Sequence, residues 1–409
     1  MIAFLLAGLL AQDPVTVAGK SIFVERPWFA RLAGDAREAR RVAVETINRS
    51  LGARYEDKGT VLFRFQDLTE EGARTRPSGT QALRNTQVVE GREVQVIEFY
   101  LEFLENRQAV LADEVLHEMT HAVMREQMDR ESYVAIPDWI REGIAVHVAG
   151  QTEALARYVL SKQRGDDPLA FLDGLDPEKD GYDDYPEDAL AIEYLSSRRE
   201  GALAALYDSL VRKKTPWKEA IAEAAGQKWE EFAPAALGFA RQRLSPLVRE
   251  GYAAFLVAHR LFRTEGKANE SEDAFQRAIE AAPTGPWSAP SRYFMGRAEE
   301  LCRKFDPGRQ TLRLFLEIDR GKSACDDDAR FTVAEIESTA GCWRAAAEEY
   351  AAYIREYPYA ASRLPEAHAR RVECLVKDGN RRDAAAEMAT LERLYPDHAA
   401  TLRAKKALR

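Results

Sequence analysis

Apolar and polar residues alternate with a period of two in short segments of the N-terminal quarter of the chain. In the segment 59–66, every second residue from Val61 onward is large and apolar, which is the pattern of a strand with one face against a core. The segment 15–24 also reads as a strand, and Val94–Tyr100 (VQVIEFY) is rich in β-branched and aromatic residues. The pattern therefore predicts three strands.

Between and after these strands, apolar residues recur at helical spacing. Asp35–Leu51 is predicted to form a helix, and the polar, turn-rich segment 67–86 a loop. A long helical pattern then covers about residues 108–128. The next helix is expected to begin at Pro137, because proline is tolerated at the first helical position, and to end at Gly150.

The remaining chain is predicted to be mostly helical and to contain repeats. Residues 165–186 are rich in Asp, Gly and Pro and are expected to be irregular, whereas residues 187–243 read as helices. Each repeat predicts a helix, a glycine turn, a second helix with small and then large apolar residues, and a proline stop. Three copies share the offsets 0, 5, 9, 12 and 17: Gly266, Ser271, Phe275, Ala278 and Pro283; Gly341, Ala346, Tyr350, Tyr353 and Pro358; Gly379, Ala384, Met388, Leu391 and Pro396. A weaker copy comprises Asp306, Thr311, Phe315 and Ile318.

The repeats start at Gly266, Asp306, Gly341 and Gly379, and the intervals between these starts are unequal. This pattern resembles the tetratricopeptide repeat, whose nominal period is about 34 residues. A generic helical bundle is the alternative, because the spacings are irregular. We expect the repeats to occupy residues 248–409 as an all-α domain, with the boundary near the segment Ser245–Gly251.

Length and charge narrow the class of protein. A chain of 409 residues is long for one hydrophobic core, so two domains are expected. The formal net charge of -9 argues against a nucleic-acid-binding protein, which would need a basic face. No internal apolar run approaches the roughly 20 residues that cross a bilayer, so no transmembrane span is expected.

The N-terminus begins MIAFLLAGLLAQDP. Its apolar run ends in a small residue, Ala11, before a polar one, and residues 1–11 therefore resemble a secretory signal sequence. No Lys or Arg precedes the run, so a first strand or helix, or a misassigned start, is the alternative. The resemblance implies export to the periplasm or the extracellular space.

Four cysteines lie in the last third of the chain, and export would permit disulfides between them. Cys302–Cys342 and Cys342–Cys374 are the pairings that stacked repeats would allow. Buried thiols in helices are the alternative, and Cys325 has no assigned partner.

The helix predicted over residues 108–128 carries the sequence VLHEMTHAVM. His117 and His121 are four residues apart and therefore lie on one face of the helix, where both imidazoles can reach one ion. Glu118 points about 100° away, toward a water on that ion, and could accept its proton. This is the HExxH pattern of metallohydrolases, and a surface helix with incidental histidines is the alternative.

A tetrahedral catalytic zinc needs a third protein ligand and one open position. The pattern HExxHxxGxxH fails, because Met124 and Gln127 stand where it requires glycine and histidine. The segment IPDWIREGIAVH instead offers Glu142 from the following helix. Gly143 comes directly after it, and the helical glycine suggests a close approach of these two helices at the metal.

HEMTH followed by PDWIREGIA resembles the gluzincin metallopeptidases, specifically the peptidase MA-like domains, over about residues 90–245. The resemblance implies an α+β zincin-like metallopeptidase domain, here residues 12–247. It implies zinc bound by His117, His121 and Glu142, with Glu118 as general base and acid.

The chain also departs from better-known relatives. Where thermolysin-like enzymes place an aspartate that supports a zinc histidine, this chain has Val146. Glu114, one turn before His117, is a candidate for that role, although a solvated helix charge is the commoner explanation. The GxMxN motif of gluzincin aminopeptidases is absent from the sequence. His147 is expected to be a packing or surface residue rather than a ligand.

Related domains also place a tyrosine after the glutamate ligand, where it stabilises the oxyanion. Tyr185 is the candidate here, with Tyr182 and Tyr194 as competitors; a packing role is the alternative for each. In zincins an edge strand above the metal helix pairs with the substrate backbone. The strand Val94–Tyr100 is either that edge strand or a plain core strand.

Three functions are compatible with these features. The first is a zinc-dependent peptidase whose repeats recruit a protein substrate or partner through a concave groove. The second is a non-catalytic scaffold in which the repeats carry the function; the presence of Glu118 argues against it. The third is a metallohydrolase acting on a substrate other than a peptide.

Overall fold

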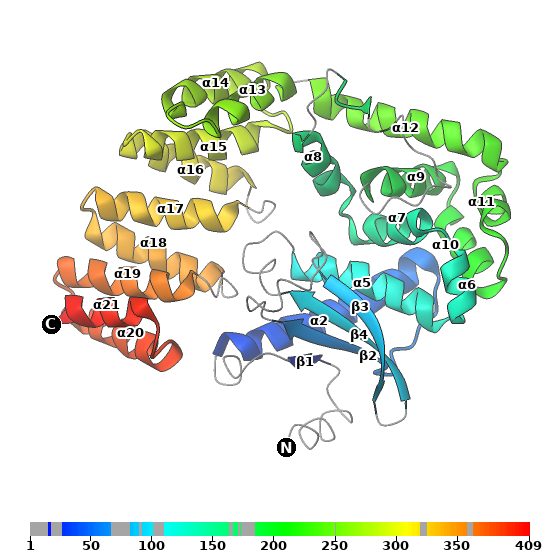
Figure 1. Ribbon diagram of the computed structural model, residues 1–409, viewed down its shortest axis with the longest axis horizontal. Helices are drawn as coiled ribbons and strands as arrows, with labels where there is room; N and C mark the ends of the chain where they lie inside the picture. The colour runs from blue at the N-terminus through cyan, green and yellow to red at the C-terminus, as the bar shows by residue number, and fades with distance from the viewer. Residues whose placement is uncertain are drawn as a thin grey trace. The chain divides into compact units, whose positions relative to one another are not determined.

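The structure is a computed structural model, and the chain divides into two compact units between Pro246 and Leu247. Among the described residues, the first unit comprises 15–17 and those within Ala30–Tyr100 and Val110–Pro246, and the second comprises 27–29 and those within Leu247–Arg409. Both are built mainly of helices, and the first also contains a small sheet (Figure 1). The described residues are 15–17, 27–66, 82–89, 92–100, 110–162, 167–170, 172, 185–249, 251–319, 325–357 and 363–409. The signal-sequence prediction for residues 1–11 and the proline stop predicted at Pro358 lie outside them.

The sheet has four strands in the order β1-β2-β4-β3. Strands β1 (Val15–Val17), β2 (Val61–Gln66) and β4 (Arg92–Tyr100) run parallel, and β3 (Ala82–Val89) runs antiparallel to β4. One prediction is thereby wrong, and one alternative that the sequence left open is decided. Strand β3 begins inside the segment 67–86, which was expected to be a loop. Strand β4 is an interior strand, and β3 is the edge strand beside it.

Two helices cover the same face of this sheet. Helix α2 (Pro27–Leu51) places Arg40 over the ring of Phe63, and helix α5 (Leu111–Glu126) accepts a hydrogen bond from Gln95 at Ala122 O. The register pairs Val61 with Gln95 and Phe63 with Ile97. Because side chains alternate along a strand, these four lie on one face of the sheet. Over residues 61–65 of β2 and 95–99 of β4 this face is apolar except for Gln95, whose amide is satisfied by the helix.

The sequence of helix α5 carries an apolar stripe of Leu111, Val115, Met119 and Ala122, of which the last three are buried and Leu111 is partly exposed. Gln127, just after the helix, receives a hydrogen bond from Tyr207 and donates one to Ala53 O. These contacts fix both the rotation of α5 and its C-terminal end.

Further helices complete the first unit, and two of them, α6 and α8, were not predicted. They are α6 (Arg130–Ala135), α7 (Asp138–Ala149), α8 (Thr152–Lys162), α9 (Tyr185–Arg198), α10 (Ala202–Tyr207), the π-helix η2 (Asp208–Arg212), α11 (Trp217–Ala225) and α12 (Trp229–Arg249). The irregular segment expected over residues 165–186 falls largely outside the described residues.

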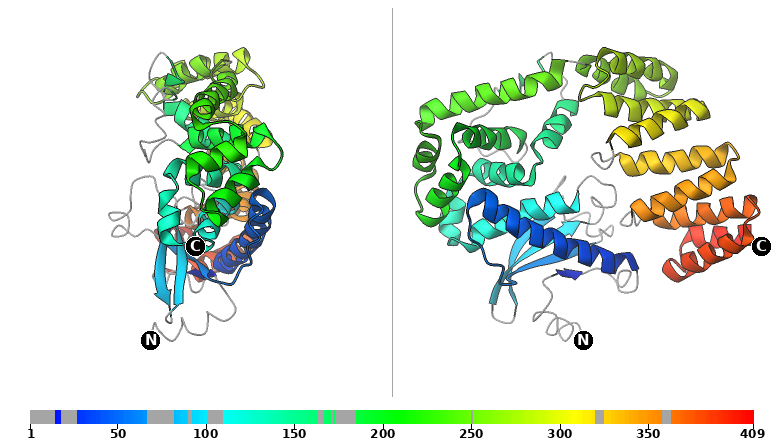
Figure 2. Two further views of the ribbon diagram at one scale, coloured as in Figure 1. Left: turned by 90° about the vertical axis from the view of Figure 1, so that its right-hand side faces the viewer. Right: turned by 180° about the vertical axis from the view of Figure 1, so that it is seen from behind.

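The second unit is a series of helical hairpins that follow one another in chain order (Figure 2). Consecutive helices pack pairwise, beginning with α13 against α14 and α15 against α16. The helices are α13 (Tyr252–Phe262), α14 (Ala268–Ala281), α15 (Ser288–Leu301), α16 (Phe305–Asp319), α17 (Asp326–Thr339), α18 (Trp343–Glu356), α19 (Leu364–Lys377), α20 (Arg381–Leu394) and α21 (Ala399–Leu408).

The predicted turn positions and buried positions are confirmed for the three strong copies. Gly266, Gly341 and Gly379 occupy the turn before the second helix of a hairpin, each with a positive φ of 76–81° that favours glycine. The predicted apolar and small positions are buried in all three: Ser271, Phe275 and Ala278; Ala346, Tyr350 and Tyr353; Ala384, Met388 and Leu391.

The weaker copy was predicted in the wrong register. The equivalent turn is at Arg303, which adopts φ 58°, and the positions 5, 9 and 12 residues after it, Gly308, Leu312 and Phe315, are all buried. Ile318, expected to be buried, is 48% exposed. With Arg303 as the turn residue in place of Asp306, the four equivalent turns follow one another at an almost constant interval along the chain. The apparent irregularity arose because an arginine holds the position of the glycine.

Two further features of the described residues bear on function. None of the described helices is both long and apolar enough to span a bilayer. All four cysteines are free thiols, so neither of the conceivable disulfides is formed. Cys374 is buried and contacts the hydroxyl of Ser338 instead.

Candidate metal centre

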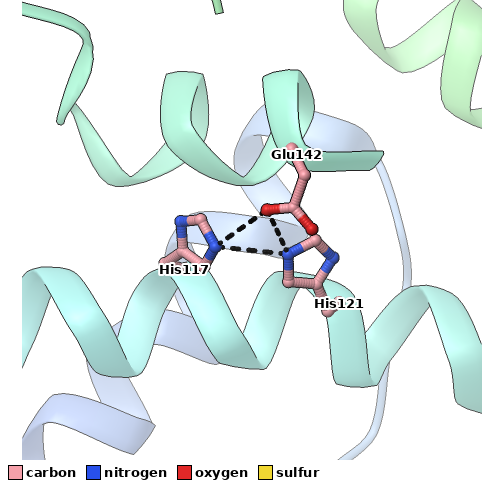
Figure 3. A group of neighbouring side chains, drawn as sticks. All are labelled: His117, His121 and Glu142. Atoms are coloured by element: carbon pink, nitrogen blue, oxygen red, sulfur yellow. Dashed lines mark hydrogen bonds and ion pairs between the residues drawn. The ribbon is translucent and has the colours of Figure 1, made fainter. Parts of the chain in front are cut away.

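Helices α5 and α7 bring three side chains to one point. His117 and His121 come from α5 and Glu142 from α7, and all three point toward one another (Figure 3). The two imidazole Nε2 atoms are 3.2 Å apart. Glu142 Oε2 lies 3.3 Å from Nε2 of His117 and 3.2 Å from Nε2 of His121.

Local sequence explains how α7 reaches this position. Asp129 caps α6 by accepting a hydrogen bond from the Ser132 N–H, so that this short helix forms between α5 and α7. Pro137 then precedes α7 as its N-cap, and Gly150 ends it in the left-handed conformation with φ 72°. The chain thereby turns back so that α7 packs beside α5.

Gly143 has a different reason from the one predicted. A Cβ atom at this position would lie 2.6 Å from Asp188 O and 2.9 Å from the Ile192 side chain, and both residues belong to α9. The close approach that needs glycine is therefore between α7 and α9, not between the two helices that carry the ligands.

The three ligand atoms fit a small tetrahedral cation. An ion about 2.0–2.1 Å from each of three ligands at tetrahedral angles requires ligand atoms about 3.3–3.4 Å apart. The observed triangle of 3.2–3.3 Å matches this spacing. Two nitrogens and a carboxylate oxygen are also the donor set that zinc prefers, although similar sites accept other divalent ions.

The electrostatics of the site favour a positive charge at its centre. Burial would lower the pKa of His117, but the hydrogen bond with Glu142 and the charges of Glu118, Glu142 and Glu114 raise it to about 9. Burial would raise the pKa of the Glu142 carboxyl, yet the charge of His121 and hydrogen bonds from both histidines hold it far below its ordinary value. The same surroundings that hold a proton here would attract a metal cation.

His117 has a polar partner on its other ring nitrogen. Its Nδ1 lies 3.0 Å from Oε1 of Gln151, whose amide N–H donates to Glu114 Oε1 over 2.8 Å. Burial raises the pKa of the Glu114 carboxyl to about 7, against the effect of the nearby His117 charge. Glu114 is thus a buried residue of the site that is connected to His117 by Gln151. No sequence motif marks Gln151.

His121 is supported by the neighbouring helix α6. The hydroxyl of Tyr133 lies 3.5 Å from His121 Nδ1, and the guanidinium of Arg141 stands 4.7 Å from the centre of the Tyr133 ring. Arg141 in turn forms an ion pair with Asp138 in the first turn of α7. The segment PDWIRE therefore supplies Glu142 to the group and also contacts Tyr133, the residue beside His121.

Glu118 is partly exposed, and it makes no hydrogen bond or ion pair with any other residue in the described part of the chain. Its charge acts on His117, which places its carboxylate near the metal ligands. A carboxylate that is close to the site and unengaged is available to a bound water or substrate.

The other predicted site residues have different outcomes. Tyr185 opens α9, but its side chain lies outside the described residues, as does all of Tyr182. Tyr194 packs against two phenylalanines and donates to Gln227, so it has a packing role. His147 contacts the Ser196 hydroxyl and is not part of the ligand group, as expected.

No protein-family model matches this sequence, and no curated protein matches it either.

Proposed function

We propose that the first unit is a zinc-dependent peptidase. The observation that carries the proposal is the convergence of His117, His121 and Glu142 at tetrahedral spacing, with Glu118 beside them. A bound zinc ion would supply Lewis acidity and a water molecule of lowered pKa. The spacing of the two histidines in the sequence and the distances between the three side chains thus both support a zinc-binding site.

The chain's own residues would perform the proton transfers. Glu118 accepts a proton from the attacking water at its carboxylate and delivers it to the nitrogen of the leaving amine. The imidazoles of His117 and His121 and the carboxylate of Glu142 would hold the zinc ion in place. The negative charge of Glu142 makes the site favourable for a cation. Tyr185, at the start of α9, is the candidate donor to the oxyanion.

The sheet supports a peptide as the substrate. Strand β3 is an edge strand, runs antiparallel to β4 and packs beside α5, the helix that bears both histidines. Its outer edge offers backbone N–H and C=O groups to an extended chain. These features, with α2 and α5 on one face of the sheet, favour a zincin-like domain and a peptide substrate over another hydrolase substrate.

For the second unit we propose tetratricopeptide-like repeats that recruit a protein substrate or partner. Hairpins whose turns recur at a nearly constant interval support a repeat array rather than a generic bundle. Stacked hairpins of this kind present an extended surface to a peptide or protein.

The test is the substitution Glu118→Gln. If Glu118 transfers the proton, the variant will bind zinc like the wild type but will lose at least 100-fold in hydrolysis of a mixed peptide library, since general acid–base catalysis contributes about 10²–10⁴-fold. Glu131→Gln, an exposed carboxylate on α6, is the matched control and should retain full activity. Equal cleavage by Glu118→Gln and wild type would refute the mechanism. Zinc binding without cleavage by the wild type would favour the scaffold alternative.

A further inference from the structure

We propose that Gln151, oriented by Glu114, is a positioning residue that sets the protonation pattern of His117 for metal binding. The inference rests on the proposed function, because it concerns the metal centre of the first unit. This chain has a valine, not a carboxylate, at position 146. Gln151 and Glu114 take the supporting role instead.

The direction of the hydrogen bonds follows from the donor and acceptor capacity of each group. An ionised carboxylate only accepts, so the group that Gln151 turns toward Glu114, 2.8 Å away, is its NH₂. The amide oxygen of Gln151 must then face Nδ1 of His117, 3.0 Å away. An amide oxygen only accepts, so Nδ1 carries the proton. In the neutral ring the lone pair therefore lies on Nε2, the atom that faces His121 and Glu142.

The backbone holds Gln151 in this place. Gly150 turns the chain out of α7 with a positive φ, and the Gln151 N–H then donates to Val146 O over 3.0 Å. The Gln151 carbonyl accepts from the Leu155 N–H at the start of α8 over 3.0 Å. Gln151 is therefore fixed on both sides, and Glu114, which is buried, fixes its side chain.

This arrangement lowers the cost of forming the metal centre. A histidine whose ring is already held with Nε2 toward the site loses less freedom when a cation binds. Partners of this kind are typically worth about 10–100-fold in metal affinity. The apolar side chain of Val146 is buried, and the backbone carbonyl of this residue accepts the hydrogen bond from the Gln151 N–H.

The test measures the Kd of the metal-free protein for Zn²⁺ by competition with a chromophoric chelator at pH 8. Gln151→Leu removes the acceptor for His117. The double exchange Glu114→Gln with Gln151→Glu reverses the amide and the carboxylate: the donor of the hydrogen bond between the two residues moves to α5, and an acceptor still faces His117. Asp113→Asn is the matched control, because it removes the adjacent carboxylate of α5, which makes no hydrogen bond to Gln151 in the described structure.

Gln151→Leu is expected to weaken zinc binding by about 10–100-fold. Both the double exchange and Asp113→Asn should stay close to the wild type. In the zinc-loaded protein, the proton on His117 Nδ1 should give a slowly exchanging downfield imidazole resonance. That resonance should disappear in Gln151→Leu and return in the double exchange. If Gln151→Leu does not fold, Gln151→Asn withdraws the acceptor while keeping an amide at the turn and should weaken zinc binding in the same direction.

Two results would overturn the role of Gln151: wild-type affinity in a folded Gln151→Leu or Gln151→Asn variant, or a double exchange that binds as weakly as Gln151→Leu. The second result would show that these side chains only maintain local packing. Failure of the wild type itself to bind Zn²⁺ is a separate outcome, because it removes the metal centre and with it the proposed function.

Discussion

At the residue scale, one carboxylate oxygen of Glu142 contacts the imidazoles of both His117 and His121. That oxygen, Oε2, lies 3.2–3.3 Å from both Nε2 atoms, and this contact, together with the charges of Glu118 and Glu114, keeps the pKa of His117 at about 9 although the ring is buried. Without metal, His117 therefore holds a proton at neutral pH. A metal ion that binds Nε2 has to displace that proton.

Zinc binding should consequently release a proton from His117 at every pH below about 9. Because this proton competes with the metal, the apparent affinity should rise with pH by about tenfold per unit up to that value and then level off. Calorimetric titrations in two buffers with different ionisation enthalpies would measure the release. An affinity that does not change between pH 7 and 9 would contradict the raised pKa.

Residue spacing within one helix made most of the convergent side chains predictable, since positions four apart share a face. His117 and His121 follow from that rule, and Glu142 from the motif in the next helix. Gln151 could not be found in this way. It reaches His117 only because a left-handed turn at Gly150 redirects the chain, and its partner Glu114 looks in the sequence like an ordinary helix charge.

At the element scale, α7 is held between two neighbours, and Gly143 sets its distance from α9. Gly143→Ala would place a methyl group 2.6 Å from Asp188 O, a backbone atom that does not give way easily. We expect the substitution to destabilise the protein by about 1–3 kcal/mol and to weaken zinc binding, because α7 carries Glu142. Urea unfolding and chelator competition would measure the two effects.

Gly238→Ala is the control for that experiment. Gly238 lies inside α12, and a Cβ atom there would meet nothing within 4 Å. This substitution should be neutral or should stabilise the protein by up to about 1 kcal/mol, because alanine favours the helix. Equal effects of the two substitutions would argue against the close contact of α7 with α9.

The turn at Arg303 offers an element-scale prediction in the second unit. Arg303 adopts φ 58°, whereas the equivalent turns at Gly266, Gly341 and Gly379 use glycine. A non-glycine residue in this region costs about 1–2 kcal/mol, so Arg303→Gly should stabilise the hairpin of α15 and α16 by about 0.5–1 kcal/mol after the entropy of glycine is subtracted.

The reverse change, Gly341→Ala, should destabilise its own hairpin. Chemical unfolding of both variants would check the pair, and a loss of stability in Arg303→Gly would contradict the assigned register.

Arg303 also shows why the weaker repeat was predicted in the wrong register. A repeat search aligned on glycine passes over an arginine that takes the same backbone conformation, and it then counts the next residues in the wrong register.

Strand β3 was missed for a related reason. Four of the eight residues in its segment ALRNTQVV are apolar, but they stand in pairs at its two ends and do not alternate with polar residues, so the period-2 pattern of a strand is absent. It becomes a strand because it pairs antiparallel with β4, which is a contact between segments and not a property of either sequence.

At the scale of the whole molecule, the division between Pro246 and Leu247 separates the metal centre from the repeats. A ligand that binds only the folded state stabilises the part that holds it, by about 2.7 kcal/mol at 100 times its Kd. We therefore expect two calorimetric transitions, of which zinc raises one and leaves the other unchanged. His121→Ala should remove the zinc-dependent shift. A shift of both transitions by the same amount would contradict this separation.

The even spacing of the hairpin turns has a consequence for how this chain could change in length. Since Arg303 and Gly341 occupy equivalent turns, loss of residues 303–340 would join Cys302 directly to Gly341 and leave a hairpin of α15 with α18. The joined turn would carry glycine, and every later helix would keep its neighbour. Whole periods, each running from one such turn to the next, are thus units of insertion or deletion, and the array could grow or shrink without a new fold.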